Sequence, residues 1–129
     1  MNTTAEKNHP HILIVDEVTA NKVRLTELLS ILKFRTYTVN ENQDPLEVFQ
    51  KHKSNINFII LNMIKPTVPN GIETLQRLKK IDPMSKVICM GDNTALIDNQ
   101  IKNMDNFSFV NGTINLYQLL RGLNITPAN

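Results

Sequence analysis

Short apolar runs alternate along the chain with stretches in which apolar residues recur at helical spacing. The clearest runs cover residues 11–15, 58–61 and 87–90. Continuous apolar runs of this length are typical of strands buried on both faces of a parallel sheet. Weaker patterns predict two more strands over residues 36–40 and 107–110. The chain is therefore expected to contain five strands.

The stretches between the runs predict helices. Leucine, isoleucine and valine recur there every three or four residues, which places them on one helical face. Helices are expected over residues 19–33, 72–81, 95–104 and 116–123, and another begins at Pro45 with Asp44 as its N-cap. His52 lies near the C-terminal end of that helix, where a histidine interacts favourably with the helix dipole.

The alternation of strands and helices predicts an α/β fold. We expect a flavodoxin-like, doubly wound (βα)5 architecture, in which a five-stranded parallel sheet has helices on both faces. The 129 residues fit one domain at 11–124, with a disordered lead-in at 1–10 and a tail at 125–129. In such sheets, ligands bind at the carboxyl ends of the strands. The polar residues that follow the strands are therefore the candidates: Asp16, Glu17, Asn62, Gly91 and the residue after Val110.

Composition narrows the choice of function. Apolar residues make up 41% of the chain and aromatic residues 5%, so the core is expected to consist of Ile, Leu, Val and Met. The net charge of +2 is small and the lysines are scattered, which does not indicate a nucleic-acid interface. Cys89 lies within an apolar run, so we interpret it as a small buried hydrophobe. No signal sequence or membrane span is indicated, and a cytoplasmic location is the default expectation.

The order and spacing of these segments resemble the response-regulator receiver domain of two-component signalling. The resemblance covers roughly residues 11–124. The segments that carry it are Ile12-Leu13-Ile14-Val15-Asp16-Glu17, then Phe58-Ile59-Ile60-Leu61-Asn62 with Pro66 and Gly71, and Lys86-Val87-Ile88-Cys89-Met90-Gly91.

The resemblance implies a particular set of reactive groups. In the family, the third strand ends in an aspartate that accepts a phosphoryl group, and an acidic pair after the first strand binds Mg²⁺. A Thr or Ser after the fourth strand and a Lys after the fifth contact the phosphate. A carboxylate is needed as the nucleophile, while the metal and the Lys neutralise developing charge.

Most of these groups are replaced in this sequence. Asp16 and Glu17 match the acidic pair, but Asn62 falls on the phosphoacceptor and Gly91 falls on the Thr or Ser position. The Lys position aligns with Asn111 or Gly112, and no Lys follows Lys102. An amide is a poor nucleophile, so acyl phosphate formation is expected to fail.

The loop after the third predicted strand also departs from the pattern. Lys65 replaces a usual Met, Pro66 matches, and Gly71 lies one position further from Asn62 than the resemblance implies. We interpret this as one inserted residue. With a carboxylate lost, Asp16 and Glu17 are expected to bind Mg²⁺ weakly or not at all, and no other cofactor is expected. If the acidic pair binds no cation, its expected role is structural: it caps the first strand–helix turn and interacts with the N-terminus of the helix.

These substitutions favour a degenerate pseudo-receiver. We expect it to be a stand-alone signalling module that acts by protein–protein contact, independently of phosphorylation. The expected partner is a signalling protein such as a histidine kinase. Formation of a homodimer is an alternative that the sequence leaves undecided. The usual contact face would include residues 95–104 and 107–110 and Tyr117, with Phe107 or Phe109 as its aromatic residue.

An enzyme is not expected, because the sequence shows no nucleophile–base pair. Two alternative functions stay open. One alternative is a small-ligand or nucleotide binder, although the loop after the first strand has no Gly-rich phosphate cradle. The other is a receiver that is phosphorylated at a different residue, such as Asp92. His9 and His11 are interpreted as surface histidines rather than a metal pair.

Overall fold

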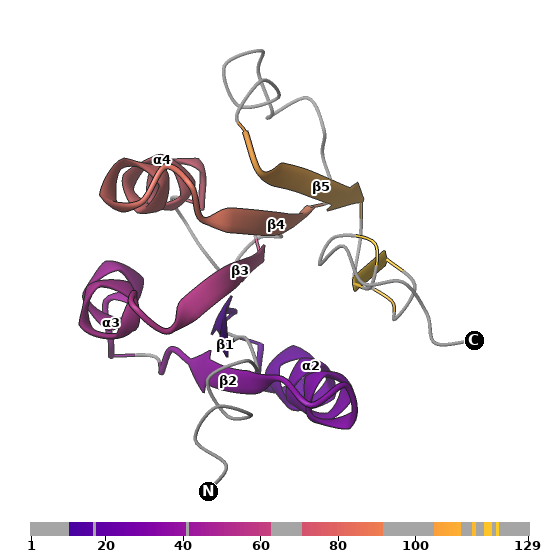
Figure 1. Ribbon diagram of the computed structural model, residues 1–129. Coiled ribbons are helices and arrows are strands. Elements are labelled where there is room, and N and C mark those ends of the chain that lie inside the picture. The colour runs from indigo at the N-terminus through magenta and orange to yellow at the C-terminus, as the bar shows by residue number, and fades with distance from the viewer. Residues whose placement is uncertain are drawn as a thin grey trace, which may run out of the picture.

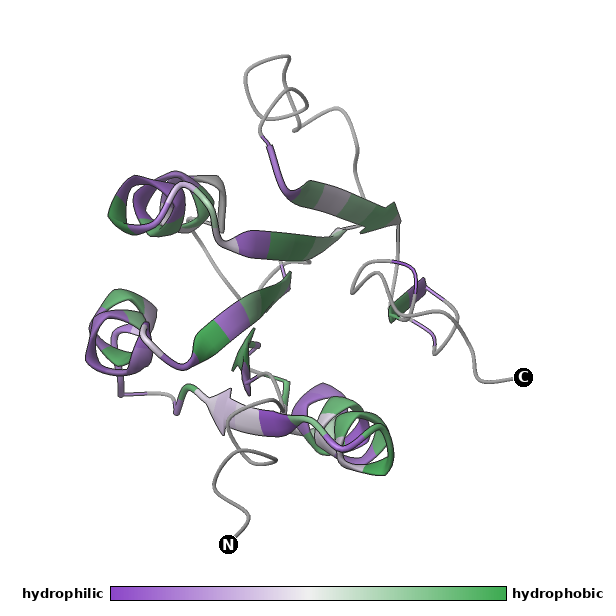
Figure 2. Cartoon of the chain, viewed as in Figure 1, coloured by the Kyte–Doolittle hydropathy of each residue, from purple (hydrophilic) through white to green (hydrophobic). Residues whose placement is uncertain are grey.

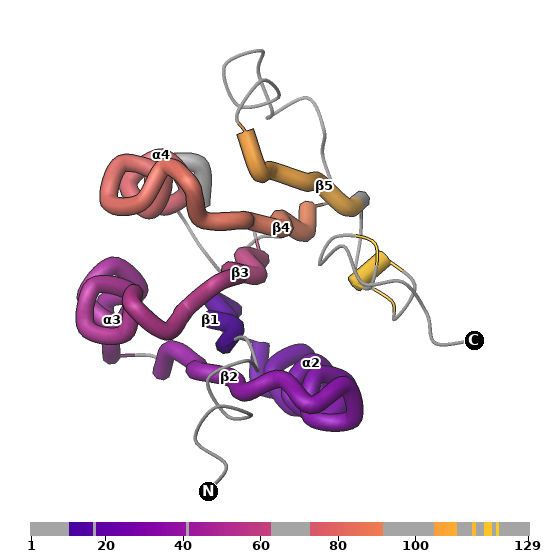
Figure 3. The backbone as a smooth tube through the Cα atoms, in the orientation of Figure 1, coloured from indigo at the N-terminus to yellow at the C-terminus, as the bar shows by residue number. Residues whose placement is uncertain are grey.

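The computed structural model describes residues 11–16, 18–40, 42–62, 71–91 and 105–111, together with residues 115, 118, 119 and 121. Five parallel strands form one sheet in the order β2-β1-β3-β4-β5 (Figure 1). The backbone trace shows them side by side (Figure 3). Their bounds are β1 His11–Val15, β2 Arg35–Thr38, β3 Ile56–Asn62, β4 Lys86–Gly91 and β5 Phe107–Asn111.

Helices cover both faces of the sheet, as the alternating pattern predicts. Helices α3 (Pro45–His52) and α4 (Gly71–Ile81) lie on one face, and α2 (Thr19–Ile31) lies on the other (Figure 1). Leu119, which is helical, packs on the α2 side. No described helix has the length and apolarity that crossing a membrane requires. The helix predicted over residues 95–104, the lead-in and the tail lie outside the described residues.

Two apolar cores lie on opposite sides of the sheet because successive strand residues point to opposite faces. Leu13, Ile59 and Cys89 belong to the core under α3 and α4. Ile14 and Ile60 belong to the core under α2. Strands β1, β3, β4 and β5 are accordingly apolar along most of their length, whereas the edge strand β2 is mostly polar (Figure 2). Cys89 is fully buried, which raises its pKa and confirms the interpretation as a structural thiol.

Local backbone geometry explains where prediction and structure differ. Helix α2 ends at Ile31 rather than at Lys33, because Lys33 adopts a left-handed φ of 70°. The N–H of Phe34 then donates to the Leu29 carbonyl at 2.9 Å, which closes a Schellman-type C-cap. Asp44 caps α3 as predicted, with its Oδ1 accepting from the Leu46 N–H at 3.0 Å.

The predicted bounds of other elements also shift: β4 is one residue longer at each end, and β5 is one residue longer at its carboxyl end. Strand β2 begins at Arg35 rather than at residue 36 and ends two residues early. Strand β3 begins at Ile56 rather than at Phe58, because Asn57 is exposed and interrupts the apolar run without ending the strand. Gly71 was expected in the Pro-rich loop and is instead the first residue of α4.

Candidate functional site

The carboxyl edge of the sheet brings four of the predicted residues onto neighbouring strands. Val15 of β1 pairs with Leu61 of β3, so Asp16 and Asn62 follow these partners side by side. Asn62 pairs in turn with Met90, and Gly91 pairs with Asn111 of β5. Adjacent strands lie about 4.8 Å apart. The edge therefore carries a short row of residues from four strands.

Asp16 is buried at the end of β1, with 2% of its surface exposed. Its Oδ1 accepts a hydrogen bond from the Val18 N–H at 2.9 Å, which closes the turn between β1 and α2. Val18 is the N-cap of α2 and makes no side-chain capping bond, so Asp16 closes the turn without capping the helix. Glu17, the second member of the acidic pair, lies outside the described residues.

The other oxygen of Asp16 could serve a cation. Oδ2 is buried and has no hydrogen-bond partner within the described part of the chain. An orphaned carboxylate oxygen of this kind suits a divalent ion, which takes oxygen ligands. The described residues nevertheless contain no group of three or more His, Cys, Asp or Glu side chains that could hold a metal. Asp16 fits as one ligand of Mg²⁺, but the described residues do not supply a complete set of carboxylate ligands around it.

Asn62 is 1% exposed at the end of β3. It stands where the resemblance implies a nucleophilic carboxylate. A neutral amide supplies neither the negative charge nor the nucleophile that acyl phosphate formation needs. Beside a buried carboxylate such as Asp16, a neutral residue also avoids repulsion between like charges. The Asn62 amide can accept and donate hydrogen bonds, but it cannot take up a phosphoryl group as a carboxylate would.

Gly91 lies directly beneath an aromatic ring. A Cβ placed on Gly91 would lie 2.7 Å from Cζ and 2.8 Å from Cε2 of Phe109, well inside van der Waals contact. Of the two candidate aromatic residues, Phe109 is therefore the one that lies against Gly91, whereas Phe107 pairs with Val87 further back along the sheet. A hydroxyl-bearing side chain at Gly91 cannot coexist with the ring in this position.

We expect Gly91→Ala to displace the Phe109 ring and to lower the free energy of unfolding by about 1–3 kcal/mol, as overpacking of a filled site does. Urea unfolding of Gly91→Ala, Phe109→Ala and the double variant would measure the coupling between the two positions. In the double variant the added methyl should cost much less than in the wild type. Equal costs in both backgrounds would show that the ring does not set the requirement for glycine.

The structure describes only some of the remaining predicted residues. Asn111 is the register partner of Gly91, which places one of the two candidates for the Lys position at the site. Gly112, Lys65, Pro66, Asp92 and Tyr117 lie outside the described residues, as does His9. The inserted loop residue therefore stays a prediction.

Comparison with known proteins finds matches in structure but not in sequence. No protein-family model and no curated protein matches the chain. Solved structures do: a response regulator receiver domain protein from Clostridium thermocellum superposes with a TM-score of 0.76 at 21% identity, covering 89% of this chain and 91% of that one. The chain has the fold of a receiver domain.

Two further matches come from complexes. One belongs to the CheX–CheY–BeF3–Mg complex from Borrelia burgdorferi, with a TM-score of 0.73, 20% identity and coverage of 88% and 86%. The other belongs to the histidine kinase ThkA with the response regulator TrrA, with a TM-score of 0.70, 21% identity and coverage of 89% and 96%. At these identities the likeness establishes the receiver fold, while the site must be judged from its own residues.

Two features at the opposite, amino-terminal edge escape sequence reasoning. Lys79 of α4 is 8% exposed, and its Nζ donates to the carbonyls of Pro83, Ser85 and Asp105. Burial lowers the pKa of Lys79, and the charges of Asp82 and Asp105 oppose this shift. No local signal distinguishes Lys79 from the exposed Lys80 beside it.

The second feature is a small aromatic stack. His52 was predicted to complement the dipole at the end of α3, and it does lie in the last turn of that helix. Its ring also stacks on Tyr37 of β2, with the ring centres 4.3 Å apart. His11, expected on the surface, is half-buried, and its ring centre lies 5.6 Å from that of Tyr37. These histidines therefore have packing roles.

Proposed function

We propose that this protein is a degenerate receiver, a signalling module that acts by binding a protein partner without being phosphorylated on an aspartate. The observation that carries the proposal is the buried Asn62 in the place of the phosphoacceptor. The register of β1 and β3 brings this amide next to Asp16. The resemblance implies a carboxylate at this position, because phosphoryl transfer needs one as the nucleophile.

The contact between Gly91 and Phe109 supports the same proposal. In a phosphorylated receiver, the resemblance implies that a hydroxyl after the fourth strand couples the phosphate to the aromatic residue of the fifth. Here the ring of Phe109 already occupies the space above Gly91. A ligand shifts a conformational equilibrium only through different contacts in the two states. Without the hydroxyl, phosphate has no such contact with Phe109.

The expected partner is another signalling protein, such as a histidine kinase. Two of the structural matches come from complexes of a receiver with CheX and with a histidine kinase. A partner that recognises the receiver fold itself would not require phosphate. Asp16 and Glu17 would bind Mg²⁺ weakly at most, because the third carboxylate is absent.

Exposure to Mg²⁺ with acetyl phosphate or beryllofluoride tests the proposal. We expect no phosphoryl adduct in the intact mass and no saturable amide shifts around Asp16 and Asn62 in NMR spectra. A receiver that retains its aspartate should respond to both reagents in parallel samples. A stable adduct would overturn phosphorylation independence, and an adduct mapped to Asp92 would identify a different acceptor.

A further inference from the structure

A groove of about 500 Å³ runs between α3 and α4 on the outer face of the molecule. One wall, formed by α3 and its cap, is acidic, and the other wall, on α4, is basic. Two half-buried aliphatic side chains, one from each helix, form the apolar part of the groove. The lining residues are Asp44, Leu46, Glu47, Gln50, Arg77, Lys80 and Ile81.

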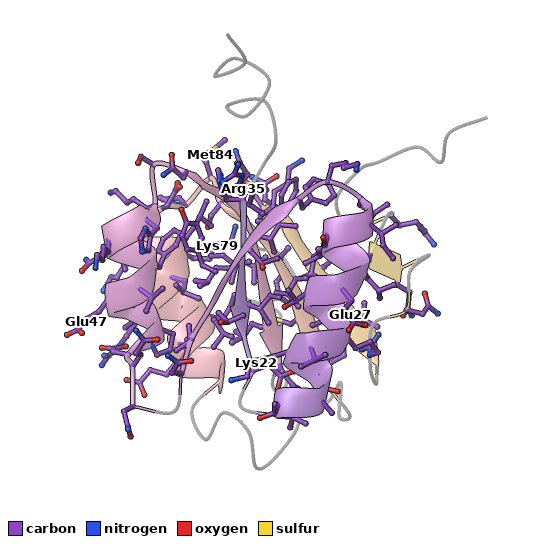
Figure 4. The ribbon with its side chains drawn as sticks, turned by 90° about the horizontal axis from the view of Figure 1, so that it is seen from below. Lys22, Glu27, Arg35, Glu47, Lys79 and Met84 are labelled. Atoms are coloured by element: carbon purple, nitrogen blue, oxygen red, sulfur yellow. The ribbon has the colours of Figure 1, made fainter. Side chains whose placement is uncertain are left out.

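The charges of the two walls are not paired with each other. Arg77 forms its ion pair with Glu73 of its own helix, at 2.7 Å. Glu47 and Lys80 are exposed, and neither takes part in an ion pair within the described part of the chain. Glu47 points outward from the molecule in the side-chain view (Figure 4). Both walls therefore present charge to whatever approaches this face.

We propose that this face binds a second copy of the chain through a two-fold symmetric interface. Helices α3 and α4 follow parallel strands on the same face of the sheet and lie side by side (Figure 1). A two-fold axis that lies in the interface and runs along the helices places each α3 opposite the α4 of the other copy. The acidic wall of each copy then faces the basic wall of the other, so one pattern of charge satisfies both.

Self-complementarity favours a second copy over other occupants. A partner of uniform charge would be repelled by one of the two walls, whereas an identical copy matches both. The groove is flanked by exposed charges, and among the described residues that line it only Leu46 and Ile81 are apolar. The interface should therefore be reversible and weakened by salt, which screens exposed charges. This proposal goes beyond the receiver function and does not rest on Asn62 or Gly91.

Charge reversal with mixing tests the interface. We expect the wild type to dimerise in sedimentation velocity at low ionic strength. Glu47→Arg and Lys80→Glu should each raise the dissociation constant by about tenfold or more, because every dimer contains the altered contact twice. An equimolar mixture of the two variants should form a heterodimer with nearly wild-type affinity, since each reversed residue then meets an opposite charge. This rescue also shows that both variants are folded.

Glu27→Arg is the matched control. It makes the same charge reversal on α2, on the opposite side of the molecule from Glu47 (Figure 4), and should leave dimerisation unchanged. A wild type that remains monomeric at high concentration and low salt would overturn the proposal. A dimer that is insensitive to both groove variants would also overturn it, because the contact would then lie elsewhere. Two variants that weaken the dimer without rescuing each other would exclude the two-fold arrangement.

Discussion

Replacing Lys79 by methionine is expected to lower the free energy of unfolding by about 2–4 kcal/mol, measured by urea denaturation. Methionine keeps the apolar stem but removes three hydrogen bonds from a charged donor. The carbonyls of Pro83, Ser85 and Asp105 would lose this partner, and Ser85 is itself buried. Because Asp105 precedes β5, the same change should loosen the start of that strand. Amide exchange of Phe107 would report this effect.

Lys51→Met provides the control for Lys79→Met, because Lys51 lies exposed in the last turn of α3. Its cost should stay within about 0.5 kcal/mol. A Lys79→Met variant as stable as the wild type would show that the three carbonyls find other donors.

The pH dependence of stability gives a second check on Lys79. Burial lowers the pKa of Lys79 from its ordinary value of 10.5. The folded protein therefore releases this proton more readily than the unfolded chain does. Between the lowered pKa and 10.5 the unfolded chain binds more protons, so the contribution of Lys79 to stability rises with pH. The stability gap between the wild type and Lys79→Met should widen as the pH approaches 10.5. A gap that narrows would contradict the lowered pKa.

Lys79 also illustrates the limit of sequence reasoning about the fold. Apolar runs predict the strands because a strand buried on both faces needs apolar residues at almost every position. The same pattern cannot separate Lys79 from Lys80, which look alike in the sequence. Lys79 is buried because its Nζ reaches the carbonyls of Pro83, Ser85 and Asp105, whereas Lys80 is exposed. The burial of Lys79 is determined by its partners, of which Asp105 lies 26 residues further along the chain.

Part of the candidate site also follows from the sequence pattern, and part depends on tertiary contacts. The placement of Asp16, Asn62 and Gly91 along one edge follows from the alternation of strands and helices, because the carboxyl ends of parallel strands share an edge. The choice between Phe107 and Phe109 could not be made in advance, since both point to the same face of β5. The pairing of Gly91 with Asn111 makes that choice by bringing Phe109 over the glycine. Register depends on neighbouring strands and is not encoded locally.

Asn62→Asp is the second change with a large expected effect. It would put a new carboxylate at a position that is 1% exposed, on the strand next to the buried Asp16. In EDTA we expect the free energy of unfolding to fall by about 2–4 kcal/mol, because two like charges would share a poorly solvated edge. A divalent cation would relieve this repulsion and would meet the Oδ2 of Asp16, which has no partner within the described residues.

Urea unfolding of Asn62→Asp with and without Mg²⁺ measures both effects. Mg²⁺ at about ten times its dissociation constant should restore roughly 1.4 kcal/mol to the variant and much less to the wild type. Asn57→Asp makes the same substitution at an exposed position of β3 and should change little in either condition. Equal Mg²⁺ stabilisation of the wild type and Asn62→Asp would mean that Asp16 holds the cation without help from residue 62. In that case the loss of the third carboxylate would not explain weak metal binding, and Asn62 would make the site degenerate only through its missing nucleophile.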